Sequence, residues 1–97
     1  MKISNWGHEY EVKVEKTQYM NGNFAIQLMC YDDEYGFWEP YGNLTVNLDE
    51  KLPDGYAYVD TNNMPNAEQF IKEYNLGVSQ GKYKCSGFCV YPLYKFF

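Results

Sequence analysis

The feature that most constrains this fold is a two-residue alternation of apolar and charged side chains along the first half of the chain. In the segment His8–Gln18, glutamates and lysines alternate with apolar residues: Tyr10, Val12 and Val14. Successive side chains of a β-strand point to opposite faces, so this period is typical of a strand with one buried face. Residues 24–31 repeat the pattern, and Asn21-Gly22 between the two runs predicts a hairpin turn.

Shorter apolar runs, separated by turn residues, follow these two strands. Further strands are expected over residues 37–41 with a continuation to 48, 56–60, 82–86 and 88–94, with Gly87 as a bend. Pro40 and Gly42 lie inside the third strand. Because proline cannot donate a hydrogen bond to a neighbouring strand, they predict a bulge or a sheet edge there.

The spacing changes to a helical period only once, late in the chain. The residues at one-face helical spacing are Ala67, Phe70, Ile71 and Tyr74. Residues 63–66 before them offer capping side chains and an early proline, and Gly77 lies where a left-handed cap is expected. No repeat or linker divides the sequence. We therefore expect one domain over residues 1–97, of the α+β class: an antiparallel β-meander of about five or six strands with one helix packed on one face.

Charge is distributed unevenly along the chain. The 13 acidic residues outnumber 8 basic ones, all lysines, for a net charge of −5. Residues 31–60, which we call the acidic middle, hold eight carboxylates against Lys51 alone, a net of −7, whereas residues 1–30 sum to zero and residues 61–97 to +2. Affinity for phosphate comes mainly from a cationic surface, so direct nucleic-acid binding is not expected.

Aromatic residues interleave with the carboxylates of the acidic middle and form the first candidate binding face: Asp32, Asp33, Glu34, Tyr35, Trp38 and Tyr41. Such a face suits a basic partner protein, because an acidic field steers the encounter and aromatic side chains anchor the contact. A sharper form of this hypothesis is a nucleic-acid mimic, whose binding would weaken with salt. The alternative is that the carboxylates are solvated turn residues and the aromatic rings pack the core.

A second candidate is the polar run formed by Asp60, Asn62 and Asn63, between a strand end and the helix start. The N–H groups at a helix N-terminus attract anions, and these side chains add donors. The alternative interpretation is that Asn and Asp here make the turn and cap the helix.

The cysteines and the only histidine give weak support to catalysis or metal binding. The chain has three cysteines, Cys30, Cys85 and Cys89, and an odd number excludes a full disulfide framework. Buried thiols are expected instead. Cys85 and Cys89 are expected on one face of a strand. With His8 the three make a formal zinc set, but their spacing matches no recurring pattern, so we expect no metal and no cofactor. No catalytic motif is present, so a non-enzymatic protein is expected, with a cysteine-dependent enzyme as an alternative.

Two further expectations concern ligands and location. A small-ligand or carbohydrate binder is the runner-up hypothesis, which coplanar exposed rings such as Trp38 and Tyr41 would favour. The longest apolar stretches, residues 24–31 and 88–94, are far shorter than the roughly 20 residues of a membrane-spanning helix. No signal peptide is recognised. A cytoplasmic protein without membrane contact is therefore expected.

Four segments resemble a family of short uncharacterised proteins carried on conjugative transposons and other mobile elements of low-GC gut bacteria, clostridia among them. These segments are LTVNL at 44–48, LPDGYAYVDTNN at 52–63, AEQFI at 67–71 and GFCVYPLY at 87–94. The resemblance covers roughly the last two thirds of the chain and contains no catalytic motif. It implies an accessory protein of a mobile element that engages host or element proteins.

Overall fold

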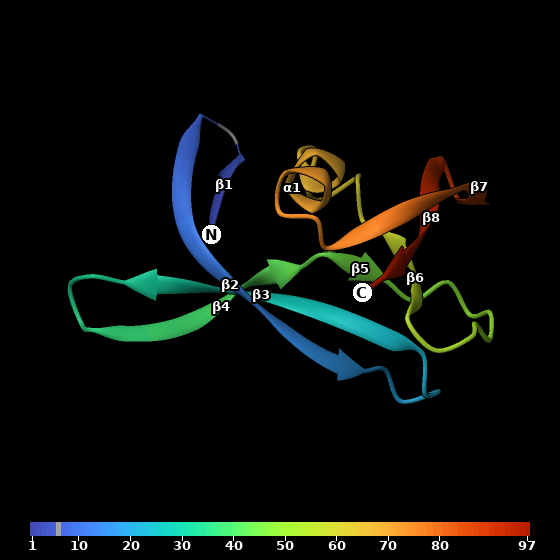
Figure 1. The fold of residues 1–97 in the computed structure, drawn as a ribbon, viewed down its shortest axis with the longest axis horizontal. Helices are drawn as coiled ribbons and strands as arrows, with labels where there is room; N and C mark the ends of the chain where they lie inside the picture. The colour runs from blue at the N-terminus through green and yellow to red at the C-terminus, as the bar shows by residue number, and fades with distance from the viewer. Residues whose placement is uncertain (6) are drawn as a thin grey trace.

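The computed structural model describes residues 1–5 and 7–97, and within them it contains eight β-strands and one α-helix (Figure 1). The elements in chain order are β1 (Lys2–Asn5), β2 (His8–Gln18), β3 (Phe24–Asp32), β4 (Phe37–Asn43), β5 (Thr45–Val46), β6 (Tyr56–Val59), α1 (Ala67–Glu73), β7 (Gly77–Ser86) and β8 (Cys89–Phe96). They form two four-stranded antiparallel sheets, with strand orders β1-β2-β3-β4 and β5-β6-β8-β7.

The expected fold class is wrong in two respects. The described chain is a mostly β fold with one seven-residue helix rather than an α+β fold, and it has eight strands in two sheets rather than one meander of five or six. The first sheet is a meander, but the second places β8 between β6 and β7. The alternation indicates which strands have one buried face, but it does not indicate to which sheet each strand belongs. The short polar strand β1 carries too little alternation to be recognised.

The predicted turn and bulge of the first sheet are confirmed. Gly22 adopts φ 88° in the turn between β2 and β3, a conformation that glycine takes without steric cost. Strand β4 is a sheet edge, and its register with β3 shifts by one residue: Leu28 pairs with Gly42 and Met29 with Pro40. Tyr41 is therefore the extra residue of a β-bulge, which re-aims a side chain relative to its neighbours.

The helix lies close to its expected position, but it ends differently. Helix α1 buries Ala67, Phe70 and Ile71, the residues with helical spacing. The left-handed residue after it is Asn75, with φ 52°, and not Gly77 as expected. Gly77 instead opens β7, where glycine is needed because a Cβ would lie 2.7 Å from the backbone oxygen of Lys95. No helix in the described part of the chain is long and apolar enough to cross a membrane.

The last two expected strands form the β7–β8 hairpin, which begins earlier and ends later than predicted. Cys85 and Cys89 lie on opposite sides of its turn, where Cys85 pairs with Val90 and Cys89 with Ser86. Cross-strand partners point to the same face and successive residues to opposite faces. The two cysteines therefore lie on opposite faces, and the expectation of a common face is wrong because a turn separates them.

The core joins both sheets and the helix. It contains Ile26 and Leu28 of β3, Val59 of β6, Phe70 of α1 and Phe96 of β8. The molecule measures 40 × 26 × 26 Å. Figure 1 shows that the turn between β3 and β4 forms one end of the longest axis and that the β7–β8 hairpin extends to the other end.

Candidate functional site

The β3–β4 hairpin carries most of the first predicted face and projects beyond the core. We call its outer part, residues 30–39, the acidic hairpin, because all of its charged residues are carboxylates. It exposes four aromatic side chains by 36% to 70%: Tyr31, Tyr35, Phe37 and Trp38. Tyr31 pairs with Trp38, and the next pair, Asp32 with Phe37, points to the opposite face. The hairpin therefore presents aromatic surface on both faces.

Asp32 holds the turn of the acidic hairpin in shape. Its Oδ1 accepts hydrogen bonds from the backbone N–H groups of Glu34 (2.9 Å) and Tyr35 (3.2 Å). The N–H of Gly36 donates to the Asp32 backbone oxygen at 2.8 Å. Asp32 thus has the structural role of a turn residue. The neighbouring Asp33 and Glu34 lie exposed at the tip.

A lysine from the adjacent strand contacts the aromatic pair. The Tyr31 and Trp38 rings meet edge to face, with centroids 5.2 Å apart and planes 62° apart. The Nζ of Lys13 lies 4.7 Å from the centroid of the Trp38 ring, in a cation–π contact. The Tyr35 and Phe37 rings are also tilted, by 39°. These rings do not form the coplanar platform that would favour stacking of a sugar.

Tyr41 is separated from the rest of the first predicted face. Its ring packs against Tyr10, with centroids 5.0 Å apart. It also lines a pocket of about 370 Å³ together with Asp60 and Asn63. The structure therefore joins Tyr41 to the second predicted group, which the sequence placed elsewhere. The bulge that causes this is recognisable from Pro40 and Gly42, but the direction of the bulged side chain is not.

Asn63 donates two hydrogen bonds to Asp60, and both residues line this pocket. Asp60 is only 7% exposed, and its two carboxylate oxygens accept hydrogen bonds from the backbone N (3.1 Å) and the Nδ2 (2.9 Å) of Asn63. Asn62 is exposed. The residue before α1, Asn66, makes no side-chain capping bond. The polar run therefore builds a turn, as the alternative interpretation held, but it does not cap the helix.

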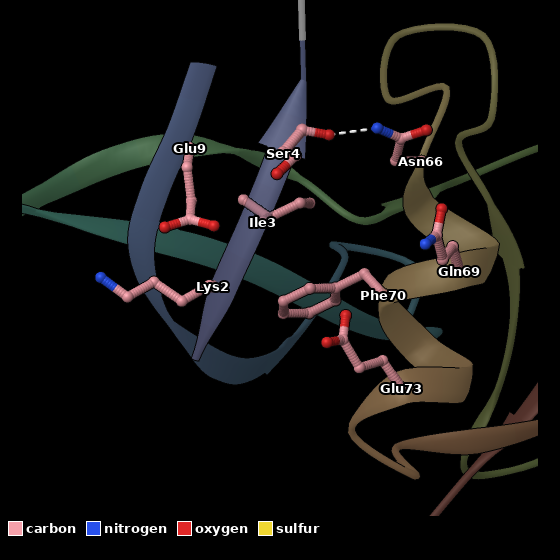
Figure 2. Close-up of a pocket in the computed structure, with 8 residues that line it drawn as sticks. All are labelled: Lys2, Ile3, Ser4, Glu9, Asn66, Gln69, Phe70 and Glu73. Atoms are coloured by element: carbon pink, nitrogen blue, oxygen red, sulfur yellow. Dashed lines mark hydrogen bonds between the residues drawn. The ribbon is translucent and has the colours of Figure 1, made fainter. Parts of the chain in front are cut away.

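A second pocket, of about 220 Å³, lies between β1 and α1 (Figure 2). Ile3 and Phe70 contribute apolar wall, and Lys2 and Glu73 contribute charge. The Nδ2 of Asn66 donates a hydrogen bond to the Ser4 carbonyl across it. The pocket is smaller than the roughly 300–1,000 Å³ of typical ligand sites. Sequence reasoning missed it because its two sides are more than 60 positions apart.

The three thiols are not buried as expected: Cys85 is exposed, and Cys30 and Cys89 are half-buried. Burial raises the pKa of the Cys30 thiol, and the negative charges of Glu39, Asp32 and Asp33 raise it further. A raised pKa lowers the fraction of nucleophilic thiolate. Among residues 1–5 and 7–97, no group of three or more His, Cys, Asp or Glu side chains is arranged to hold a metal ion.

A charged network that the sequence did not reveal ties the second sheet to the loop before it. The Nζ of Lys84 lies 2.6 Å from Glu50 Oε2, and the Tyr58 hydroxyl donates to the same oxygen at 3.2 Å. The lysine's hydrogen bond and charge hold the pKa of the Glu50 carboxyl below its usual value, and the same pairing raises the pKa of Lys84. In this network the positive charge of Lys84 is paired with the carboxylate of Glu50.

Comparison with known proteins gives a family but no activity. The family model described as "Domain of unknown function (DUF4313)" matches residues 13–97. No curated protein and no solved structure matches the chain significantly. The match supports the expected resemblance at the level of an uncharacterised family, and it does not extend to a mobile element or a bacterial group.

Proposed function

This chain belongs to the DUF4313 family of domains of unknown function, and we propose that it is a non-enzymatic protein-interaction module whose acidic hairpin binds a basic protein. The observation that carries the proposal is the acidic hairpin itself: four exposed aromatic side chains on a projecting hairpin that contains carboxylates and no lysine. Isolated exposed apolar residues are ordinary, but grouped aromatic side chains, here the Tyr31–Trp38 and Tyr35–Phe37 pairs, are typical of a binding surface.

The two kinds of side chain have separate roles in this proposal. Asp33, Glu34 and Glu39 supply the negative field that speeds the encounter with a basic partner and sets its orientation. Tyr35 and Phe37 supply the anchors, because tyrosine and other aromatic side chains bury a large area when a partner covers them.

The contact of Lys13 with Trp38 supports a basic partner. A lysine ammonium lies 4.7 Å from the ring centroid within the molecule itself, so the ring already has the geometry of a cation site. A lysine or arginine of a partner can use the ring of Tyr35, which is 70% exposed, in the same way. Such a contact adds roughly 0.5–2 kcal/mol, depending on how far it is desolvated.

The resemblance of the later segments supports a biological setting for this activity. We place the protein in the cytoplasm as an accessory protein of a mobile element, where its partners are basic proteins of the element or of the host. Many basic proteins bind nucleic acids, and the sharper form of the proposal is that the acidic hairpin occupies such a protein's nucleic-acid site. Competition between this chain and double-stranded DNA for a captured partner tests that form.

The experiment that tests the proposal is a capture of proteins from a lysate of the producing cell at about 0.1 M and about 1 M salt, between which the Debye length falls from about 10 Å to about 3 Å. We expect the wild type to capture basic proteins that the higher salt releases. The double variant Asp33→Lys, Glu34→Lys should lose them. A matched control, Asp54→Lys with Glu73→Lys, reverses two exposed charges elsewhere and should retain them. Equal capture by all three proteins would contradict the proposal.

A second candidate function is favoured by one observation. Tyr41, Asp60 and Asn63 come from both predicted groups and meet at one pocket, whose volume of about 370 Å³ lies in the range of small-ligand sites. The probe is a panel of mono- and disaccharides, with the melting temperature as the measurement. A sugar that raises the melting temperature of the wild type but not of Tyr41→Ala would support this candidate. No rise with any sugar would contradict it for carbohydrates.

A further inference from the structure

The charges of the β7–β8 hairpin are opposite to those of the acidic hairpin. We call residues 77–96 the basic hairpin, because they contain three lysines and no aspartate or glutamate. Lys84 is paired with Glu50. Lys82, nearer the turn, and Lys95, nearer the base, are exposed, and the Nζ of Lys95 lies 5.8 Å from the centroid of the Tyr56 ring.

The basic hairpin also exposes apolar side chains near its turn. Cys85 pairs with Val90, and Tyr83, two residues before Cys85 on the same strand, points to the same face. Tyr83 is 65% exposed and Val90 51% exposed, while Phe88 in the turn is fully exposed. A surface that combines exposed aromatic side chains with one sign of charge has the composition of an interface rather than of ordinary solvated surface.

The two hairpins cannot meet within one molecule. Figure 1 shows them at opposite ends of the longest axis, which measures 40 Å. Both lie at sheet edges, because β4 and β7 are terminal strands of their sheets. Pro40 and the bulge interrupt the edge of β4, and a register shift between Ser79 and Tyr83 interrupts that of β7. Such interruptions oppose the addition of a further strand, so contacts at these edges are made by side chains.

We propose that the basic partner of the acidic hairpin is the basic hairpin of a second copy of this chain. Two copies lying antiparallel bring each acidic hairpin against the basic hairpin of the other copy, and the two contacts are equal by two-fold symmetry. The inference rests on the function proposed above, since it names the partner of the same hairpin. Charge complementarity selects this occupant: the acidic hairpin contains four carboxylates and no lysine, and the basic hairpin contains three lysines and no carboxylate.

In this antiparallel dimer, both ends of each molecule contact the other copy. A stable interface buries about 800 Å² on each partner, which is more than one hairpin tip supplies. An antiparallel dimer doubles the contact and covers exposed aromatic side chains of both hairpins. The acidic field of one end also faces the positive field of the other, which speeds association at low salt.

Sedimentation at a series of protein concentrations tests the inference with a charge exchange. The wild type should form dimers at about 0.1 M salt and dissociate at about 1 M salt. The triple variant Asp33→Lys, Glu34→Lys, Glu39→Lys changes the net charge of the acidic hairpin from −4 to +2, and Lys82→Glu, Lys95→Glu changes that of the basic hairpin from +3 to −1. Each variant alone should dimerise at least about tenfold more weakly, because like charges meet at both contacts.

A mixture of the two variants should restore the dimer, because every contact in the mixed pair again joins opposite charges. The control Asp54→Lys, Glu73→Lys should dimerise like the wild type, and circular dichroism checks that each variant is folded. A mixture that stays monomeric would overturn the inference. A wild type that stays monomeric but captures basic proteins through the acidic hairpin overturns it and leaves the proposed function standing. A wild type that does neither overturns both.

Discussion

Asn23 shows how one buried polar residue joins two loops of the first half of the chain. It is 3% exposed, and its Nδ2 donates to the Glu50 carbonyl (2.6 Å) and to Asn47 Oδ1 (3.2 Å), while its Oδ1 accepts from the Leu52 N–H (3.0 Å). Asn23→Ala leaves these partners without their bonds, so the free energy of unfolding should fall by roughly 1–3 kcal/mol. Denaturant titration measures the loss. The exposed Asn62→Ala should change stability by less than about 0.5 kcal/mol, and equal losses would contradict this role for Asn23.

The Glu50–Lys84 pair makes stability depend on pH. The hydrogen bond from Lys84 lowers the folded-state pKa of Glu50 below its unfolded value of about 4.3. The pair therefore stabilises the folded chain fully above that unfolded value, and the contribution is lost as the pH falls through the lowered folded value.

Glu50→Gln should remove this pH-dependent part of the stability. The difference in unfolding free energy between wild type and variant should be present near about pH 6 and should vanish at acid pH below both pKa values. The side chains are solvent-exposed, so salt should reduce the difference. Denaturant titration across the pH range measures it, with Glu34→Gln in the exposed hairpin turn as the control. A difference that is constant with pH would contradict the assignment.

At the scale of elements, Gly77 shows how closely β7 and β8 approach each other. A Cβ at this position would lie 2.7 Å from the Lys95 oxygen and 3.2 Å from the Phe96 Cα, both backbone atoms of β8. Gly77→Ala should therefore push the strands apart and cost about 1–3 kcal/mol of stability. Thermal unfolding measures the cost. The control is Ser79→Ala, at an exposed position of the same strand, which should change stability little. Gly81 is unsuitable as a control position because its φ of 67° strains any other residue.

The exposed rings of the acidic hairpin should contribute to partner binding and little to stability. Phe37 lies outside the core cluster, so Phe37→Ala should change stability by less than about 1 kcal/mol. The same variant should weaken binding of the partner by about tenfold or more, as expected for an aromatic anchor. Isothermal titration with the captured partner and thermal unfolding of the free chain separate the two effects. A large loss of stability with unchanged affinity would assign the ring to packing.

Some of these elements could be predicted from the sequence, and others could not. Local chemistry made β2, β3 and the bulge at Pro40 and Gly42 predictable, because alternation, turn residues and the missing proline N–H act within a few positions. The assignment of strands to two sheets, and the contact of Tyr41 with the pocket of Asp60, depend on residues distant in sequence. The acidic hairpin was identified as a candidate from composition alone, but the separate structural role of Asp32 follows from hydrogen bonds that only the folded turn makes.

At the scale of the whole molecule, a single core links the two sheets, and this predicts cooperative unfolding. Leu28 of the first sheet and Val59 of the second are fully buried in the same cluster as Phe70 of α1. Leu28→Ala removes packing shared by both sheets and should cost roughly 2–5 kcal/mol. Hydrogen exchange of the backbone amides measures the effect on each sheet separately.

If the core is shared, the amides of β8 should lose as much protection in Leu28→Ala as those of β3, although residue 28 does not belong to the second sheet. Val78→Ala, on the exposed side of β7, is the matched control and should leave protection in both sheets nearly unchanged. If β3 lost protection while β8 kept it, the sheets would unfold as separate units. The two hairpins would then be held on bodies that move independently, and an antiparallel dimer, which needs both ends of one molecule at a fixed separation, would lose its geometric basis.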